Sequence, residues 1–236
     1  MPPTPPSSFA AGILGAGLGS RLRGVSACKP LAEVAGETLL GRTSRLLREN
    51  GASPVICALR DELLPLEARA HLPEGPTYIF VNTESSLHTL AEVAKALPQP
   101  WPAHVFFTMA DTVLSPGDFR DFLAFCRGLQ PAECGILATR FIDDENPLYV
   151  HANEEGRVLR FGGSDRSPIV TSGMYCLSSS ALALVAPEVA RGTKKMRNFL
   201  GLLASRGMAI KSFVVEKTVD VDHPMDLAQA ETLLGG

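Results

Sequence analysis

The stretch FAAGILGAGLGSRLRGVSACKPL, residues 9–31, runs from an apolar segment through a glycine-rich loop into a basic cluster. Residues 9–14 have the composition of a β-strand. Glycines stand at positions 12, 15, 17 and 19, and Arg21, Arg23 and Lys29 follow them. A glycine backbone can adopt positive φ and approach a ligand closely, so that several N–H groups face one anion. The stretch therefore predicts a strand that ends in an anion-binding loop.

Beyond this stretch, apolar runs of strand type alternate with segments of helical periodicity. The expected strands of the first half are residues 9–14, 54–59, 77–82 and 104–111. The expected helices are residues 38–51, 61–72, 86–97 and 116–129, and Pro65 interrupts the second of them early. In the less regular second half we expect strands at 133–142 and 169–177, a hairpin-like piece at 147–163, and helices near 178–190, near 195–205 and from 224 onward. Four consecutive strand–helix units favour a parallel sheet with helices on both faces. The expected fold is α/β, with a Rossmann-like, doubly wound sheet that is mixed but mainly parallel.

The composition is that of an ordinary globular protein, and it excludes several classes of partner. The chain has 236 residues, of which 45% are hydrophobic and 20% charged, and 22 basic against 25 acidic residues give a net charge of −3. We therefore expect no binding of nucleic acid or of a membrane surface, and no run approaches the roughly 20 apolar residues of a membrane span. Five cysteines without a CxxC pair argue against a disulfide framework or a zinc site, and favour the cytoplasm.

The glycine loop fits two common phosphate-binding motifs poorly. A dinucleotide fingerprint runs GxGxxG, but Ser20 stands where its third glycine belongs, and no strand that ends in an acid follows at the right distance. A Walker loop runs GxxxxGK[ST], and the sequence contains no such string. A flexible turn without a ligand is the plain structural alternative.

A third motif matches more specifically. Residues 14–31, LGAGLGSRLRGVSACKPL, resemble the signature LAAGxGxRL…PKPL of the nucleotidyltransferases that act on sugar phosphates and related phosphorylated alcohols. Gly15 stands where that family usually has alanine, and Cys28 stands where it has proline. The resemblance implies the nucleotide-diphospho-sugar transferase fold and a reaction that releases pyrophosphate from a nucleoside triphosphate.

The same resemblance implies which residues bind the triphosphate. Arg21 and Lys29 are expected to act in catalysis by binding phosphates, since a planar guanidinium suits bidentate contact and a lysine supplies a point charge. The string NTESSLHTL, residues 82–90, occupies the place of a base-recognition segment in relatives, although its turn lacks their glycine. The expected nucleotide-binding residues are Leu14, Gly15, Ala16, Gly17, Gly19, Ser20, Arg21, Lys29, Asn82 and Thr89.

A triphosphate substrate calls for Mg²⁺, which prefers one or two carboxylates and completes its shell with water and phosphate oxygens. Asp111 ends the apolar run HVFFTMAD, as the metal-binding aspartate of the family does, although it could also form a turn before Pro116. The string VEKTVDVDHPMDLAQAE, residues 215–231, resembles the family's closing segment vDIDTPEDLxxAE. Asp220 and Asp222 lie two residues apart and share a face of an extended segment, so one Mg²⁺ could meet both or one of them.

Other roles are open for the acids of this closing segment. Pro224 suits the first turn of a helix, so Asp222 or His223 could cap that helix. Asp226 is expected in the first turn, where a carboxylate favours the helix dipole. Asp220 has no such structural explanation.

The acceptor side of the site carries fewer signals. The string TSGMYCL, residues 171–177, resembles a family strand that places Gly173 near the acceptor, and the alternative is a simple sheet glycine. A basic residue for the acceptor phosphate has no clear counterpart. Arg160 is our candidate for acceptor binding together with Gly173, and the other candidates are Arg166, Lys194 and Lys195.

Together these features predict a Mg²⁺-dependent nucleotidyltransferase whose partners are a nucleoside triphosphate and a phosphorylated small molecule. The layout resembles compact cytidylyltransferases for inositol phosphate, choline phosphate and similar compounds, so CTP is favoured. Uridylyl or guanylyl transfer to a sugar 1-phosphate, and a catalytically silent nucleotide-binding regulator, are alternatives. We expect a disordered Pro-rich tail at 1–8 and one domain at 9–236, with a nucleotide-binding half (9–130) and an acceptor-binding half that includes the C-terminal metal segment (131–236). A homodimer is left open.

Overall fold

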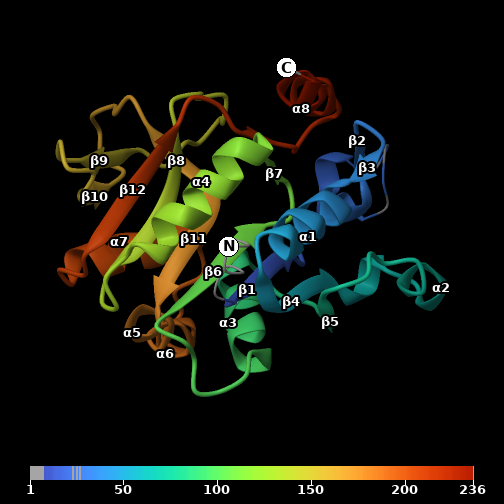
Figure 1. Cartoon of the computed structure of the whole chain (residues 1–236), viewed down its shortest axis with the longest axis horizontal. Coiled ribbons are helices and arrows are strands. Elements are labelled where there is room, and N and C mark those ends of the chain that lie inside the picture. The colour runs from blue at the N-terminus through green and yellow to red at the C-terminus, as the bar shows by residue number, and fades with distance from the viewer. Residues whose placement is uncertain (1–7, 23, 25, 27, 236) are drawn as a thin grey trace, which may run out of the picture.

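The centre of the protein is a seven-stranded sheet. The computed structural model describes residues 8–22, 24, 26 and 28–235, so the expected tail lies outside the described residues except for Ser8. The strand order is β12-β8-β11-β6-β1-β4-β5 (Figure 1). Within this sheet only β11 runs antiparallel to its neighbours, which confirms a mixed, mainly parallel sheet. The bounds are β12 Ile210–Val215, β8 Cys134–Thr139, β11 Val170–Ser178, β6 His104–Met109, β1 Phe9–Gly15, β4 Ala52–Arg60 and β5 Thr77–Val81.

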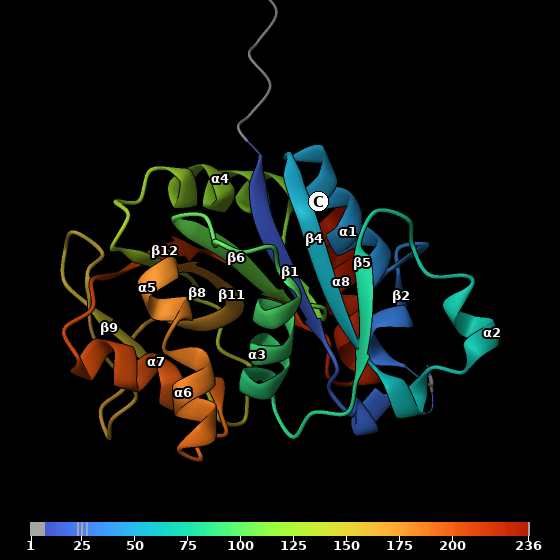
Figure 2. The same cartoon turned by 90° about the horizontal axis from the view of Figure 1, so that it is seen from below.

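Helices cover both faces of this sheet, as expected for a doubly wound fold (Figure 2). One face carries α1 (Leu39–Glu49) and α4 (Pro116–Arg127). The opposite face carries α3 (Ser86–Ala96), α5 (Ser179–Leu182), α6 (Val185–Ala190) and α7 (Met196–Ser205). The polar N-caps Thr38, Ser85, Ser115 and Ser178 accept backbone hydrogen bonds at the starts of α1, α3, α4 and α5, which fixes where these helices begin.

The alternation of side chains along the strands produces the two apolar layers. Phe106 belongs to the core beneath α4, whereas its neighbour Phe107 belongs to the core beneath α3. In β1, Gly12 lies against α3, because a Cβ atom there would stand 2.6 Å from Val93 and 2.7 Å from Phe107. This glycine therefore allows the helix and the sheet to approach closely.

The structure departs from the sequence expectations in the irregular segments. The helix expected at 61–72 is interrupted at Pro65, as predicted, but only a short part of it is α-helical: Asp61–Leu63 form a 3₁₀ turn and Leu66–Arg69 form the short helix α2. Leu66 is 78% exposed, whereas Leu64 is buried in the core and Leu72 packs against it. The helix expected near 178–190 is divided into α5 and α6.

Short elements near the carboxyl ends of the central strands complete the fold. They are the 3₁₀ turns Ser20–Leu22 and Lys29–Leu31, the strand pair β2 (Glu33–Val34) and β3 (Glu37–Thr38), the pair β7 (Thr112–Val113) and β13 (Val219–Asp220), and helix α8 (Pro224–Gly235). The hairpin β9 (Val150–Ala152) and β10 (Val158–Phe161) lies beside β12 in Figure 1. In the part of the chain that the structure describes, none of the helices has the length and apolarity to cross a bilayer.

Candidate active site

The glycine loop leaves the carboxyl end of β1 and turns back through two 3₁₀ turns. Leu14 is buried in the core, so any ligand contact there must come from its backbone. Gly17 has open space around it, since a Cβ atom added to it would have no neighbouring atom within 4 Å. Gly19 adopts a φ of +55°, and a Cβ atom on it would stand 2.7 Å from the Cβ of Lys29. The loop therefore combines an open, exposed backbone at Gly17 with close packing of Gly19 on Lys29.

The first residues of the loop are tightly surrounded. A Cβ on Gly15 would stand 3.0 Å from the Leu59 side chain and 3.1 Å from the carbonyl of Ala58, which explains glycine at this position. The carbonyl oxygen of Ala16 accepts a hydrogen bond of 3.1 Å from the guanidinium of Arg60. The same guanidinium donates to the carbonyl of Thr83 at 2.9 Å, so Arg60 ties the loop to the segment before α3.

Lys29 is the buried cation at the centre of the site. It opens the 3₁₀ turn Lys29–Leu31 and is 9% exposed. Its ammonium contacts the carboxylates of both Asp111 and Asp222. Burial alone would lower the pKa of Lys29, but the two carboxylates more than offset this and raise the pKa above its ordinary value. Lys29 is therefore charged throughout the neutral range.

Asp111 and Asp220 are brought together by the short ribbon of β7 and β13. In this antiparallel pair, Asp220 lies opposite Thr112, and the hydroxyl of Thr112 donates a 2.7 Å hydrogen bond to the Asp220 carboxylate. The carbonyl of Asp111 also accepts a 3.1 Å hydrogen bond from the backbone N–H of Val221. Asp111 and Asp220, which are far apart in the sequence, therefore lie next to each other at the carboxyl ends of the sheet strands.

Gly173 lies directly against this ribbon. It has a φ of +54° in β11, where the register with β8 is irregular. A Cβ atom on Gly173 would stand 2.2 Å from the hydroxyl oxygen of Thr112, so only glycine leaves room for the threonine that contacts Asp220. Gly173 thus has a specific steric role beside the acids.

The surroundings of Asp220 weaken its acidity. The side chain of Asp220 opens onto a pocket, yet the surrounding protein atoms, and next the charge of Asp111, raise its pKa to about 7. Burial, and then the charges of Asp220 and Asp111, also raise the pKa of the Tyr175 phenol. A cation bound beside Asp220 would favour its charged form.

Asp222 has different partners from Asp220. The chain bends after Asp220, since the N–H of Asp222 donates to the carbonyl of Asp220 at 2.9 Å, yet both acids line the same pocket. The Asp222 carboxylate contacts Lys29, and it also lies 3.7 Å from the Arg21 guanidinium. Asp226 stands in the first turn of α8, as expected, and accepts hydrogen bonds from the N–H groups of Asp222 and His223 at 2.8 and 2.6 Å.

A pocket of about 360 Å³ opens in front of the acids. Its lining residues are Ser86, Met109, Asp111, Asp144, Leu148, Thr171, Gly173, Tyr175, Lys195, Met196, Arg197, Asp220 and Asp222. Lys195 and Arg197, at the start of α7, are the basic residues of this lining. The pocket thus combines carboxylates with two cations that could receive an anionic group of a ligand.

The structure separates the other candidate basic residues from this pocket. Arg160, which we expected near Gly173, instead lines a different cavity beside the β9–β10 hairpin, and Arg166 does so too. The guanidinium of Arg160 pairs there with Asp165 and donates to the carbonyl of Gly162. Lys194 forms a surface ion pair of 3.6 Å with Glu84.

The two residues expected to contact the base have other partners here. The Oδ1 atom of Asn82 accepts from the N–H of Glu62 at 3.2 Å, on the exposed surface. Thr89 is 2% exposed, and its hydroxyl donates to the carbonyl of Ser85 at 3.1 Å and contacts the hydroxyl of Thr83 at 2.6 Å. Thr89 therefore stabilises the start of α3 in this conformation. Of Ser20 the structure shows only that it begins a 3₁₀ turn.

Sequence reasoning did not single out Arg60, Thr112, Tyr175 or Arg197 as site residues. Arg60 ends a strand in the string PVICALR, and a charge at the carboxyl end of a strand is the signal that could have found it. Thr112 follows Asp111 directly, but its contact with Asp220 depends on the pairing of two-residue strands. No local pattern reveals such a pairing.

The donor set can be compared with what a metal ion requires. Among residues 8–22, 24, 26 and 28–235, no three His, Cys, Asp or Glu side chains form a ready-made metal cluster. Asp111 and Asp220 supply a pair of carboxylates that line one pocket. A pair of hard oxygen ligands suits an ion such as Mg²⁺, which completes its shell with water and substrate oxygens. A bound cation would also favour the charged form of Asp220, whose pKa is raised by burial and then by the charge of Asp111.

The chain resembles known proteins in sequence and in structure. It is 31% identical, over 245 residues, to the bifunctional IPC transferase and DIPP synthase of Rubrobacter xylanophilus. This match covers 96% of the chain but only 52% of the relative, so the chain spans about half of that protein.

Solved structures share the fold at low sequence identity. The inositol-1-phosphate CTP transferase from T. maritima superimposes with a TM-score of 0.76 at 16% identity, covering 98% of this chain and 97% of that one. The CTP:phosphocholine cytidylyltransferase from Streptococcus pneumoniae gives a TM-score of 0.68 at 14% identity, covering 96% and 98%. These likenesses show the nucleotide-diphospho-sugar transferase fold.

The family assignment rests on the sequence itself. The family model of the MobA-like NTP transferase domain matches residues 11–198, which include the glycine loop, Lys29 and Asp111. This match covers well over half of the chain. The chain therefore belongs to the family of MobA-like NTP transferase domains.

Proposed function

We propose that this protein transfers CMP from CTP to a phosphorylated polyol of the inositol phosphate type and releases pyrophosphate. The observation that carries the proposal is the pocket in which Asp111 and Asp220 face Lys195 and Arg197. The names of the Rubrobacter relative and of the T. maritima structure support an inositol phosphate acceptor and CTP. The preference for CTP rests on these likenesses.

In this proposal an oxygen of the acceptor phosphate attacks the α-phosphorus of the triphosphate in line with the bond that breaks. A new phosphorus–oxygen bond forms, the bond from the α-phosphorus to its bridging oxygen breaks, and pyrophosphate leaves. The attacking phosphate is an anion at neutral pH, so the chain needs no general base. Positioning and neutralisation of charge carry the catalysis.

Different residues of the chain would bind the triphosphate and the acceptor. The exposed backbone around Gly17 would donate hydrogen bonds to the triphosphate, and Arg21 would contact its outer phosphates. Lys29 has three N–H donors, and its contacts with Asp111 and Asp222 hold it at the floor of the site. Lys195 and Arg197 would bind the acceptor phosphate.

We propose Mg²⁺ as the metal, with Asp111 and Asp220 as its protein ligands. The support is the donor set, since the two carboxylates line the same pocket and the charge of one raises the pKa of the other. When bound, Mg²⁺ would neutralise charge on the α-phosphate and on the leaving pyrophosphate. Asp222, which contacts Lys29 and Arg21, would orient these two basic side chains.

The proposal is tested by pyrophosphate release with Mg²⁺, each of CTP, UTP, GTP, ATP and dTTP, and a panel of acceptors. The panel contains inositol 1-phosphate, glucose 1-phosphate, glycerol 3-phosphate and phosphocholine. We expect release with CTP and inositol 1-phosphate. Release with another pair would replace these substrates, and triphosphate binding without release across the panel would favour a silent nucleotide-binding protein.

Matched variants connect the activity to the pocket. Asp111→Asn should lower kcat by about 100-fold or more, whereas Asp121→Asn, on the surface of α4, should leave it unchanged. Lys195→Gln should raise the KM for the acceptor, whereas the neighbouring Lys194→Gln should not, because Lys194 pairs with Glu84 on the surface. Full turnover in Asp111→Asn would remove this aspartate from the mechanism.

A further inference from the structure

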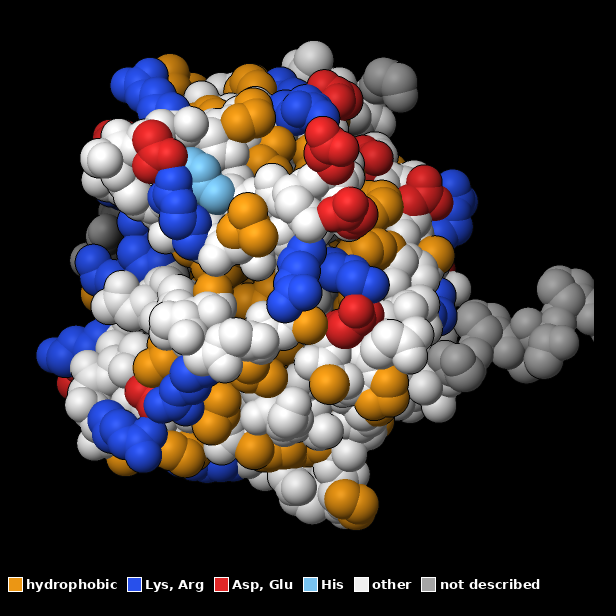
Figure 3. All heavy atoms as spheres, turned by 90° about the vertical axis from the view of Figure 1, so that its left-hand side faces the viewer, with side chains coloured by type: hydrophobic (Ala, Val, Ile, Leu, Met, Phe, Trp, Pro, Cys, Tyr) orange, Lys and Arg blue, Asp and Glu red, His pale blue; other side chains and the backbone are white. Residues whose placement is uncertain are grey.

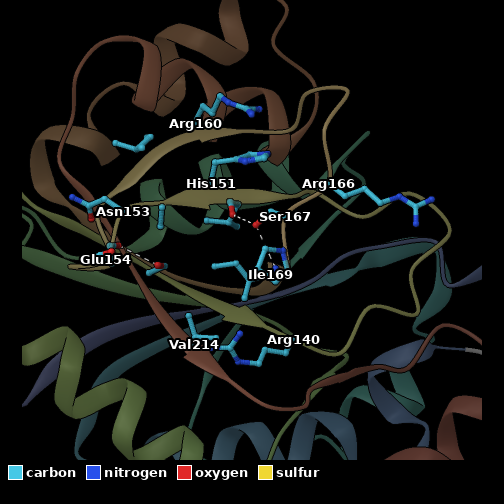
Figure 4. A pocket seen from close by; sticks show the side chains of 15 residues that line it. Arg140, His151, Asn153, Glu154, Arg160, Arg166, Ser167, Ile169 and Val214 are labelled. Atoms are coloured by element: carbon cyan, nitrogen blue, oxygen red, sulfur yellow. Dashed lines mark hydrogen bonds between the residues drawn. The ribbon is translucent and has the colours of Figure 1, made fainter.

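A second cavity, of about 630 Å³, lies beside the β9–β10 hairpin (Figure 4). The hairpin, the segment before β11 and strand β12 form its walls, and it shares no lining residue with the pocket of Asp111. Its volume lies within the range of small-molecule sites, roughly 300–1,000 Å³. The lining residues are Arg140, Val150, His151, Ala152, Asn153, Glu154, Gly156, Leu159, Arg160, Arg166, Ser167, Pro168, Ile169, Ser212 and Val214.

The lining carries three arginines. Figure 3 shows the side of the molecule on which β9, β10 and β12 lie, where a histidine has a basic and an acidic side chain close to it. Arg140 pairs with Glu216 at 3.2 Å, and Arg160 pairs with Asp165. Those carboxylates are 87% and 61% exposed, and ion pairs with exposed partners contribute little stability. A ligand anion can therefore replace them at small cost.

His151 supplies an independent observation. Its Nε2 atom is buried and finds no hydrogen-bond partner among the described residues, while its Nδ1 atom lies 3.8 Å from the Asp165 carboxylate. Buried polar atoms are nearly always paired in folded proteins, so this nitrogen needs an explanation. Figure 4 places His151 between Arg160 and Ser167. An anion that binds Arg160 would lie within the same group of side chains.

The rest of the lining suits a hydroxylated ligand. Ser167 and Ser212 contribute hydroxyl groups, which now donate to the carbonyls of Val150 and Gly156. Val150, Ile169 and Val214 provide apolar surface between them. Arginine and histidine side chains, together with hydroxyl groups and apolar surface, form the chemistry that recognises a phosphorylated sugar or polyol.

We infer that this cavity is a second binding site, separate from the catalytic pocket, for a small phosphorylated polyhydroxy compound. The guanidinium of Arg160 and the imidazole of His151 bind the phosphate, and Asp165 gives up its contact with Arg160. The inference stands on the cavity and its residues, and does not depend on the proposed substrates of the catalytic pocket.

The test uses the full chain with ¹⁵N-labelled histidines and follows the imidazole signals by NMR. The signal of His151 is assigned from its loss in His151→Asn. Titration with glucose 6-phosphate should shift this signal saturably, and uncharged glucose should not shift it. Arg160→Gln should weaken the binding by about tenfold or more, the loss expected for a charge-assisted contact. Arg157→Gln, an exposed arginine in the same hairpin outside the lining, should bind normally.

Contrary results would overturn the inference in distinct ways. If the His151 signal does not shift, or if Arg160→Gln binds as tightly as the unmodified protein, the cavity is not a phosphate site. If inorganic phosphate binds as tightly as glucose 6-phosphate, the cavity recognises only the anion, and recognition of the polyhydroxy part is refuted. A shift of the other histidines without His151 would place the binding elsewhere.

Discussion

The glycines of the first loop differ in what a side chain would meet. Gly19 has positive φ and packs on Lys29, whereas Gly17 faces open space. Gly19→Ala should therefore destabilise the protein by about 1 kcal/mol or more, because an L-residue is strained in the left-handed region. It should also weaken triphosphate binding through displacement of Lys29. Thermal unfolding and triphosphate titration measure both effects.

Gly17→Ala is the matched control for this prediction. Its added methyl group meets no protein atom, so the free energy of unfolding should change by less than about 0.5 kcal/mol. If triphosphate binding nevertheless weakens, the methyl group obstructs the ligand. This result would be expected if the phosphates lie close to the backbone of Gly17. Wild-type stability in Gly19→Ala would contradict the close packing of this glycine on Lys29.

A buried carboxylate far from the site makes stability depend on pH. Glu188 is 3% exposed and pairs with Arg191 at 2.5 Å and with Arg206 at 2.8 Å. Burial alone would raise the pKa of Glu188, but the hydrogen bond from Arg191 and the charge of Arg206 lower it below the usual 4.5. A lowered pKa in the folded state stabilises the protein above the unfolded pKa, and this stabilisation is lost as the pH falls through the folded pKa.

Glu188→Gln should therefore lower the free energy of unfolding at pH 7, and the difference from wild type should shrink as the pH falls below about 4.5. Urea unfolding at several pH values measures this. Glu92→Gln, which removes an exposed pair with Lys95, should have a small effect at every pH. A difference for Glu188→Gln that stays constant down to about pH 3 would refute the linkage.

At the scale of elements, the site depends on pairings too short to leave a sequence pattern. The β7–β13 ribbon consists of two residues on each side, yet it positions Asp111 and Asp220. The ribbon fits against β11 only because residue 173 is glycine: a Cβ atom there would stand 2.2 Å from the hydroxyl oxygen of Thr112.

Gly173→Ala should consequently cost about 1–2 kcal/mol in stability and should reduce turnover by displacing Thr112 from Asp220. Gly201→Ala is the control: this glycine lies inside α7 with no atom near its Cβ position, so alanine there should raise stability. Thermal unfolding and pyrophosphate release follow both variants. If Gly173→Ala changed stability and turnover no more than Gly201→Ala does, the backbone at Gly173 would be shown to accommodate a side chain without strain.

The long elements of the fold were predictable from sequence, and the short ones were not. Strand and helix periodicity extends over enough residues to place the β-α alternation of the first half, and Asp111 follows from its place after an apolar strand. The interruption of the helix at 61–72 was predictable from Pro65, but the short length of α2, four residues at Leu66–Arg69, was not. Arg160, one of the candidates for acceptor binding, lines the other cavity and pairs with Asp165 there, and no sequence pattern indicates that partner.

At the scale of the whole molecule, three distant parts of the chain meet in one small apolar cluster beside the site. Its members are Leu22, Ala32, Val34, Leu39, Val113, Val219, Val221 and Ala230. They come from the loop region, from the segment after Asp111 and from the C-terminal segment. The cluster therefore joins the parts that carry Arg21 and Lys29, Asp111, and Asp220. Sequence periodicity could not reveal it, because each part contributes only a few residues.

If this cluster holds the site together, a change inside it should lower stability and ligand binding at the same time. Leu22 is fully buried in the cluster and follows Arg21 directly, so Leu22→Ala should cost about 2–5 kcal/mol. It should also weaken triphosphate binding at temperatures where the variant is still folded, because Arg21 and Asp222 lose their shared support. Leu66→Ala, at a position that is 78% exposed, should change neither quantity. Thermal unfolding, followed by triphosphate titration well below the midpoint, separates the two effects. A destabilised Leu22→Ala variant that binds the triphosphate with unchanged affinity would show that the loop and the C-terminal segment are positioned independently of the cluster.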